Sequence, residues 1–235
     1  MNANEVLEQL KALGNPSTKK VLMKHGAPDN IWGVKVGDMK PIVKKIKKDY
    51  ELAKELYNSG YSDAMYFAGL IADEKQMTKK DLSDWVAKAD WYMISEYTVP
   101  WITAESKHAL ELGLEWIEND NENIASAGWS TLANYCSIRP DEELDIDLFE
   151  TLLHRVSNDI HQMQNRVRYT MNGFVISVGS YITDLTDKAQ KVASHIGKVE
   201  VNMGETACKV PMATTYIQKV IDKGRLGKKR KMARC

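Results

Sequence analysis

The stretch QNRVRYTMNGFVISVGSYI, residues 164–182, shows the pattern from which nearly the whole chain is built. Its apolar residues recur three or four positions apart, which is the spacing of one face of an α-helix; they are Val167, Met171, Phe174, Val175 and Val178. Two glycines, Gly173 and Gly179, stand inside the pattern, where each costs a helix about 1 kcal/mol and permits a close approach or a bend. The stretch therefore predicts a long helix that packs against neighbouring helices.

The same spacing extends outward along the 235 residues. Besides helices over 1–13 and 17–26 and a short one after Pro41, helices are expected near 49–59, 62–73, 78–88, 90–102, 105–118, 121–136, 146–158, 163–181, 185–196 and 211–223. Only IWGVKVGDMKP, residues 31–41, looks extended. Paired helices recur with a unit of roughly 35–45 residues, which is the period of HEAT-like arrays.

This periodicity predicts an all-α fold, a curved α-solenoid of HEAT-like antiparallel helix pairs. A single such domain is expected over residues 1–223, with its binding surface on the concave face. An irregular compact helical domain is the alternative. The remaining residues, 224–235, are rich in Lys and Arg and contain two glycines, so we expect a mobile basic C-terminal tail.

The composition is that of an ordinary soluble protein, 43% hydrophobic and 27% charged. No stretch approaches the roughly 18 apolar residues of a membrane span, and no export signal is visible, so a cytoplasmic protein is expected. Cys136, Cys208 and Cys235 are odd in number and widely separated, which argues against a disulfide scaffold or a zinc site. The sequence thus predicts neither a metal nor a cofactor.

The net charge of zero conceals an asymmetry along the chain. Residues 1–50 carry a net charge of +5, residues 51–150 carry −14, and residues 151–235 carry +9. Two basic ends around an acidic middle can offer a positive surface to a polyanion. The asymmetry favours nucleic acid as a partner, although an acidic middle also suits the solvated outer face of a helical array.

The segment ADWYMISEYTVPW, residues 89–101, surrounds one acid with aromatic rings. On a helix one face forms a core stripe; it consists of Trp91, Ile94, Thr98 and Trp101. Tyr92 and Glu96 lie side by side on the adjacent face, four residues apart. Pro100 has no N–H for the carbonyl of Glu96, so the helix should kink there. Spacing alone leaves two interpretations, a buried aromatic helix whose Glu96 reaches solvent, or a functional carboxylate beside a ring.

Three groups of cations are candidates for neutralising DNA phosphates without reading the base sequence. They are Lys44, Lys45, Lys47 and Lys48 after Pro41, Arg166 and Arg168 at the start of the 164–182 helix, and the tail residues Lys228, Lys229, Arg230 and Lys231. Cations at a helix N-terminus gain nothing from the helix dipole, which suggests that Arg166 and Arg168 serve a partner. The lysine run is also explained by a solvated helix face.

Four stretches together resemble the bacterial DNA alkylation repair family, the AlkD-type HEAT-like DNA glycosylases. They are GVKVGDMKPIVKKIKK, ADWYMISEYTV, NENIASAGW and VRYTMNGFVISVGSYI, and the resemblance covers roughly residues 5–220. It implies a curved array whose concave basic surface holds duplex DNA. Family enzymes hydrolyse the glycosidic bond of N3- and N7-alkylated purines, using aromatic rings to stabilise the cationic charge and a carboxylate to position water.

Carried over by position, the resemblance places the catalytic carboxylate at Glu96 and a lesion-contacting ring at Tyr92. It places a second ring at Phe174 and a basic cleft position near Gly128, beside Trp129, which is a further candidate aromatic contact. Every one of these positions differs from the family pattern. The missing arginine and the longer Glu side chain weaken the case for catalysis, because a misplacement of about 1 Å can cost about 10²-fold in rate.

Three hypotheses follow from the sequence. The first is a DNA-binding member of the family that holds duplex DNA, alkylated or distorted, on its concave surface. The second is an active N-glycosylase in which Glu96 supplies the carboxylate. The third is a helical scaffold that binds protein.

Overall fold

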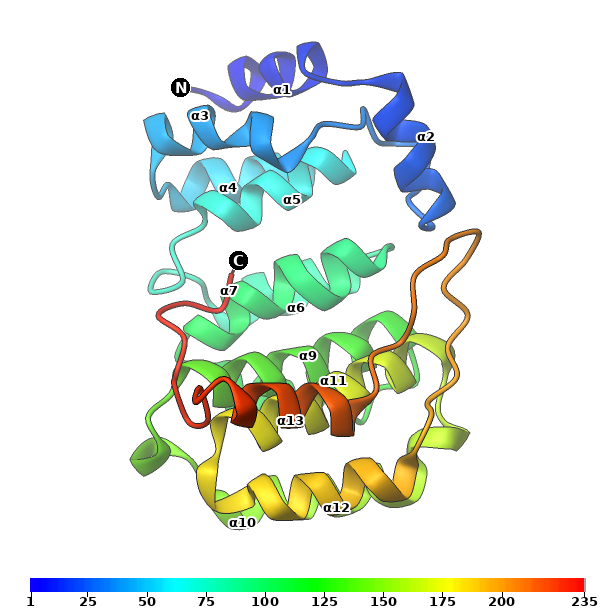
Figure 1. Ribbon diagram of the computed structural model, residues 1–235. Helices are drawn as coiled ribbons and strands as arrows, with labels where there is room; N and C mark the ends of the chain where they lie inside the picture. The colour runs from blue at the N-terminus through cyan, green and yellow to red at the C-terminus, as the bar shows by residue number, and fades with distance from the viewer. Residues whose placement is uncertain (235) are drawn as a thin grey trace.

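The computed structural model describes residues 1–234, and these fold as two layers of helices without any strand (Figure 1). Helices alternate between the layers along the chain, so that consecutive helices pair antiparallel, as in HEAT-like repeats. The outer layer contains α4 (Tyr50–Asn58), α6 (Lys79–Ala87), α8 (Ala109–Trp116), α10 (Ile146–Asp159) and α12 (Thr186–Ile196). The predicted α-solenoid of helix pairs is confirmed.

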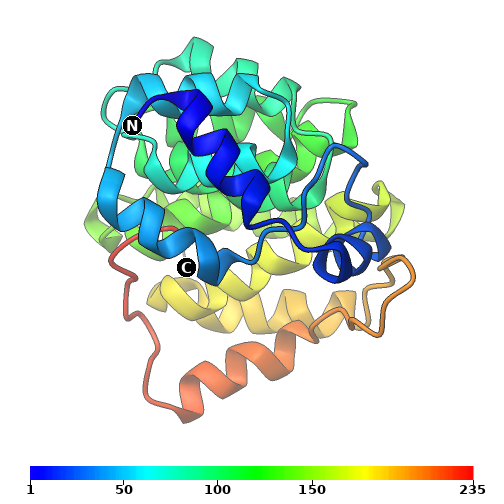
Figure 2. The same cartoon turned by 90° about the horizontal axis from the view of Figure 1, so that it is seen from above.

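The inner layer contains the second helix of each pair, and its segments η1, α9 and α11 line the cavity described below. Its members are α5 (Ser62–Ile71), the π-helix η1 (Met93–Thr98) that continues as α7 (Val99–Glu105), α9 (Glu122–Ile138), α11 (Asn165–Tyr181) and α13 (Ala213–Asp222). Three helices form the N-terminal end, α1 (Ala3–Ala12), α2 (Pro16–Lys24) and α3 (Val36–Ile46). Figure 2, seen from that end, shows α1 lying across the array.

Side chains of the turns explain where several helices begin. The hydroxyl of Thr78 accepts the N–H of Asp81 at 3.1 Å, and Asp81 in turn accepts the N–H of Thr78, which makes a reciprocal capping box. Asn121 and Asp145 cap α9 and α10 in the simpler way, each accepting N–H groups of the first turn. The apolar spacing predicts these helices to within a few residues, and the caps determine the residue at which each helix begins.

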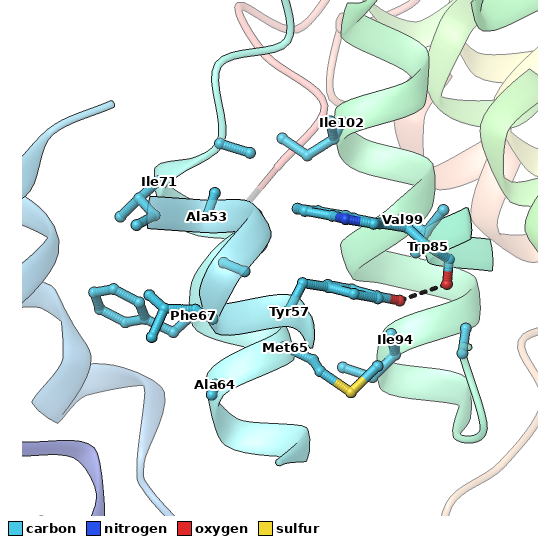
Figure 3. Packing of buried hydrophobic residues seen from close by; sticks show 14 of the residues in the cluster. Ala53, Tyr57, Ala64, Met65, Phe67, Ile71, Trp85, Ile94, Val99 and Ile102 are labelled. Atoms are coloured by element: carbon cyan, nitrogen blue, oxygen red, sulfur yellow. Dashed lines mark hydrogen bonds between the residues drawn. The ribbon is translucent and has the colours of Figure 1, made fainter. Parts of the chain in front are cut away.

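Two hydrophobic clusters fill the space between the layers, one in each half of the array. In the N-terminal cluster the rings of Tyr57 and Trp85 stack with centroids 4.0 Å apart, and the Tyr57 hydroxyl donates to the carbonyl of Trp85 at 2.7 Å (Figure 3). In the C-terminal cluster Phe174 packs between Trp129 and Phe149, with ring centroids 5.2 and 5.9 Å away. Each half thus has its own aromatic centre.

The helix expected over 90–102 is interrupted. A π-turn replaces its first part: the N–H of Val99 reaches the carbonyl of Ile94, five residues back. The physical reason lies at Pro100, which has no N–H to donate to the carbonyl of Glu96. The helix therefore takes one extra residue per turn, as a π-helix does, before α7 begins. The predicted core stripe of this segment is buried throughout, with Ile94 and Thr98 fully so.

The extended segment is shorter than expected. Residues 31–35 form no helix, with Gly33 in the left-handed region at φ 81°, but α3 already begins at Val36 and contains Pro41. Pro41 stands in the second turn, close enough to the helix start that the loss of one hydrogen bond is tolerated.

The expectation of a mobile C-terminal tail is wrong for the described residues, because the tail is packed along the inner layer. Lys229 donates to the carbonyl of Cys136 at 2.9 Å and pairs with Asp141 at 2.6 Å. The backbone N–H of Ala233 donates to Glu105 at 2.7 Å, and its methyl group is fully buried. Arg234 reaches the carbonyl of Leu70. Residues 229–234 therefore link α9, α7 and α5 as a strap; Cys235 lies outside the described residues.

Within residues 1–234, no helix combines the length and apolar character that crossing a membrane requires.

Candidate nucleic-acid interface

The centre of the site is an ion pair between Glu96 of η1 and Arg166 in the first turn of α11. Nε and Nη2 of Arg166 each donate to one carboxylate oxygen of Glu96, both at 2.6 Å. The Glu96 side chain is 2% exposed and that of Arg166 is 14% exposed. A fork of this kind is the strongest form of side-chain ion pair, and its two parallel bonds fix the plane of the guanidinium. The carboxylate is thereby closed off by the arginine.

Two tyrosine rings contact the same guanidinium. The central carbon of Arg166 lies 4.7 Å from the ring centroid of Tyr92 and 4.5 Å from that of Tyr169. Attraction between a cation and a ring face strengthens when both are shielded from water, as they are here. The remaining terminal nitrogen, Nη1, donates to the sulfur of Met203 at 3.6 Å. Arg166 and Met203 both line the adjoining cavity.

That cavity has a volume of about 570 Å³ and opens between η1, α11 and the loop formed by residues 197–212. Its walls combine rings, amides, cations and one acid, and they include Trp91, Tyr97, Asn123, Asn165, Asn202, Lys209 and Asp90. No group of three or more His, Cys, Asp or Glu side chains in residues 1–234 is placed to hold a metal ion. The wall chemistry suits an anionic or aromatic ligand.

Further contacts hold the backbone around the cavity. The carboxylate of Glu122 in α9 accepts the backbone N–H of Arg166 at 2.7 Å and so caps the start of α11. The side chain of Asn165 bonds twice to Asn202, donating to its carbonyl at 2.9 Å and accepting its N–H at 2.6 Å. The loop continues to Gly204, where an added Cβ would stand 2.9 Å from the carbonyl oxygen of Lys24 at the end of α2, and Figure 1 shows the loop beside that helix. Both halves of the array thus meet at the cavity.

Burial dominates the electrostatics of the carboxylate. It raises the pKa of Glu96 to about 7, and this exceeds the opposing effect of Arg166, which stabilises the charged form. The pKa of Tyr92 is raised for the same reason, again against Arg166. Pairing with Glu96 raises the pKa of Arg166, which overcomes the effect of its burial. The arginine is charged at any ordinary pH, whereas Glu96 titrates near neutrality.

Residues 6–209 match the model of a known family, DNA alkylation repair enzyme. The chain belongs to this family. An uncharacterized protein of Listeria monocytogenes is 37% identical over 216 residues, which is 90% of this chain and 93% of the relative. An uncharacterized protein of Listeria innocua is 36% identical over the same shares.

A solved structure is similar over its full length, with 40% identity, a TM-score of 0.92 and 100% of both chains covered. It represents a new family of proteins related to the HEAT-like repeat DNA glycosylases, with affinity for branched DNA structures. The all-helical HEAT-like fold of the present chain is the fold of that neighbour.

Two ring positions assigned from the DNA alkylation repair family are not at the cavity. Trp129 and Phe174 are both fully buried, and each ring packs against the other in the C-terminal cluster. The prediction that they contact a lesion is therefore corrected: they are core residues, and the apolar spacing that placed Phe174 on the helix stripe was the better guide. Tyr92, by contrast, is half-buried and lines the cavity.

The position near which a family arginine was expected is occupied by a helix crossing. Gly128 of α9 lies so close to α8 that an added Cβ would stand 2.6 Å from the backbone nitrogen of Ile117 and 2.9 Å from the carbonyl oxygen of Gly113. No side chain fits there without separating the two helices. An arginine at position 128 would not fit this crossing, and Arg166 is the arginine that reaches the carboxylate.

The predicted DNA-contacting cations fall into two groups in the structure. Lys44, Lys45 and Lys47 are exposed at the end of α3, Lys228 is exposed just before the strap, and Lys231 is exposed within it. The others have partners within the protein: Lys48 pairs with Glu74, Arg168 bonds to Asn165 at 3.5 Å, Lys229 pairs with Asp141, and Arg230 donates to the carbonyl of Ala233 at 2.7 Å. A role in DNA binding stays a prediction for all of them.

Several cavity residues could not be found from the sequence patterns described above. Tyr169 follows Arg166 by three residues on α11, and this helical spacing is the one local signal that would have placed both on one face. Asn123, Asn202 and Lys209 come from other helices and loops, and no local pattern connects them to the site. Only the fold brings them together.

Proposed function

We propose that the protein binds DNA through its inner layer, with branched DNA preferred over linear duplex, and that it does not excise bases. The proposal rests on one observation: two cationic side chains and one exposed acid, Asp90, line the cavity, and the carboxylate of Glu96 is closed off behind Arg166. Arg166 and Lys209 line the cavity, whereas the Glu96 side chain is 2% exposed. The full-length similarity to a solved protein with affinity for branched DNA supports the choice of ligand.

The closed carboxylate argues against glycosylase activity on chemical grounds. A carboxylate that positions water or stabilises a developing cation must come within hydrogen-bond reach of the reacting atoms. Both oxygens of Glu96 are instead engaged by Arg166 at 2.6 Å. Opening the pair would leave a buried carboxylate without its partner, and breaking such pairs costs about 3–5 kcal/mol.

Binding of a labelled four-way junction and of a linear duplex of equal length, each measured across a salt titration, tests the proposal. The junction is expected to bind more tightly, and both affinities should fall steeply as salt rises, because phosphate contacts release counterions. A K44Q/K45Q variant should reduce the salt slope by about one for each phosphate that the variant no longer neutralises. The control is K188Q/K191Q, which removes two exposed lysines from the outer helix α12.

The alternatives give different results. Binding that does not respond to salt, or no binding to either DNA, would refute the proposal and leave the protein scaffold. DNA that contains 7-methylguanine or 3-methyladenine is expected to release no free base. Release that is abolished by Glu96→Gln would instead establish an active N-glycosylase.

A further inference from the structure

The inner helices α11, α9, α7 and α5 end at one edge of the array, and the strap runs along that edge (Figure 1). Together with the two residues before it, the strap reaches a carbonyl oxygen in the last turn of three of these helices. The hydrogen bonds run from the Gly227 N–H to Ser180 of α11 at 3.0 Å, from the Arg230 N–H to Ser137 of α9 at 2.8 Å, and from the Arg234 guanidinium to Leu70 of α5. These carbonyls are among the last four of each helix, which have no partner within the helix.

The strap also reverses the charge of this edge. A helix C-terminus carries a partial negative charge of about half an elementary charge, and two carboxylates stand beside these helix ends. Glu105 accepts the N–H of Ala233 at 2.7 Å, and Asp141 pairs with Lys229 at 2.6 Å. An uncovered edge of this kind would repel phosphates. Docking of the strap engages these negative groups and adds cations to the edge.

Two lysines of this segment, Lys228 and Lys231, are exposed beside the covered helix ends. We propose that they make the edge a second phosphate-binding surface, which holds one arm of a branched DNA while the cavity lined by Arg166 and Lys209 holds another. This inference rests on the proposed function. It adds the surface and the DNA feature that account for a preference for branches.

The two basic surfaces lie at opposite ends of the inner helices. The cavity borders the first turns of α9 and α11, through Asn123 and Asn165, whereas the strap and the residues before it meet their last turns. Each of these helices has 17 residues, so the surfaces are about 25 Å apart. The inner face between them contains a smaller cavity of about 240 Å³, and apart from Glu96 and Arg230 its lining side chains are uncharged.

This separation suits a branch better than a linear duplex. A straight duplex has one axis, whereas the arms of a branch diverge from one point. A branch can therefore place phosphates on both surfaces while its branch point lies over the uncharged middle of the inner face. The second contact is then intramolecular, so it strengthens the binding of a branch more than the binding of a linear duplex.

Neutralisation of the two exposed lysines in the full-length chain tests the inference. K228Q/K231Q should lower the affinity for a four-way junction about tenfold or more at about 0.15 M salt, and should reduce the salt slope by about two. The affinity for a linear duplex of equal length should fall much less, so that the junction preference is lost. The control K188Q/K191Q removes the same charge from the outer helix α12 and should leave the junction preference unchanged.

Docking of the strap is tested separately by A233D and M232D. These variants change the charge equally at neighbouring positions, of which one is buried and the other exposed. A233D should lose most of the junction preference, because the strap cations leave the edge and the carboxylates of Glu105 and Asp141 are uncovered. M232D leaves the strap docked and should keep the preference.

The outcomes distinguish this inference from the proposed function. A wild-type protein that binds neither DNA, or binds both equally, overturns the two together. A wild-type preference for the junction that survives in K228Q/K231Q, including an equal fall in both affinities, overturns this inference alone. An equal loss of preference in A233D and M232D also overturns it, because the strap would then contribute charge without needing its docked position.

Discussion

Replacement of Gly128 and Gly173 by alanine should change stability in opposite directions, although both glycines lie inside 17-residue helices. At Gly173 of α11 an added Cβ has no neighbour within 4 Å. At Gly128 of α9 it would stand 2.6 Å from the backbone nitrogen of Ile117, whereas ordinary contacts begin near 3.4 Å. The atom in the way belongs to the backbone of the α8 C-cap, so it cannot rotate aside as a side chain would.

The magnitudes follow from these distances. Alanine is preferred over glycine in a helix by about 1 kcal/mol, so Gly173→Ala should gain up to that amount. Gly128→Ala gains the same backbone preference but overpacks the crossing, which typically costs about 1–3 kcal/mol or more, and here the packing of α8 on α9 must widen. A net loss of about 1–2 kcal/mol is expected.

Urea unfolding followed by circular dichroism measures both changes, and the difference between the variants should be about 2–3 kcal/mol. Each kcal/mol corresponds to a Tm shift of about 2–4 °C for a chain of this size. If Gly128→Ala is as stable as wild type, α8 and α9 do not approach as described. A side chain such as arginine would then be tolerated at position 128.

Three further outcomes test other parts of the structure. The pKa of Glu96 in the folded protein is about 7, above its ordinary value of 4.5. The stability that the protonated side chain contributes is therefore complete below pH 4.5 and is lost as pH rises through 7. The free energy of unfolding should fall by about 3 kcal/mol between pH 4.5 and pH 8, and the E96Q variant should not show this fall. Ala233→Asp would bury a charge and should undock the strap, so trypsin should cleave the tail of this variant faster. In the control Met232→Asp, the new charge lies at an exposed position, and trypsin should cleave the tail as fast as in the wild type. Tyr57→Phe removes the hydrogen bond to the Trp85 carbonyl and should lower the free energy of unfolding by about 1 kcal/mol in the same urea assay. An unchanged urea midpoint would contradict the presence of this buried hydrogen bond.

Helical spacing predicts most of the fold because local chemistry and packing agree along this chain. The stripe of α11, the Thr78 cap and the buried face of the 89–101 segment all follow from residues within one or two turns of each other. The π-turn is predictable only as a kink, since Pro100 reveals a lost donor but not how the chain compensates for it.

The site is less predictable because its contacts span long separations in sequence. Glu96 and Arg166 each stand out in the sequence, but 70 residues separate them and nothing local indicates that they pair. Charge and glycines predict a mobile tail, whereas the structure holds it through the methyl group of Ala233, buried beside Trp101, and through hydrogen bonds of Lys229 and Arg234. The many Lys and Arg residues of the tail predict that it stays in solvent, and a few specific hydrogen bonds are enough to hold it against the protein.

The strap has a practical consequence for anyone who handles this protein. Because Ala233 is buried and Arg234 bonds to α5, the last described residues lie against the inner layer, and Figure 1 shows the red, described part of the tail running toward α5 and α7. An affinity tag fused to the C-terminus would start on that surface and compete with any ligand there, and a charged tag would also alter the local field. Tags, dyes and surface-attachment points belong at the N-terminus, where Met1 is exposed at the far end of the array.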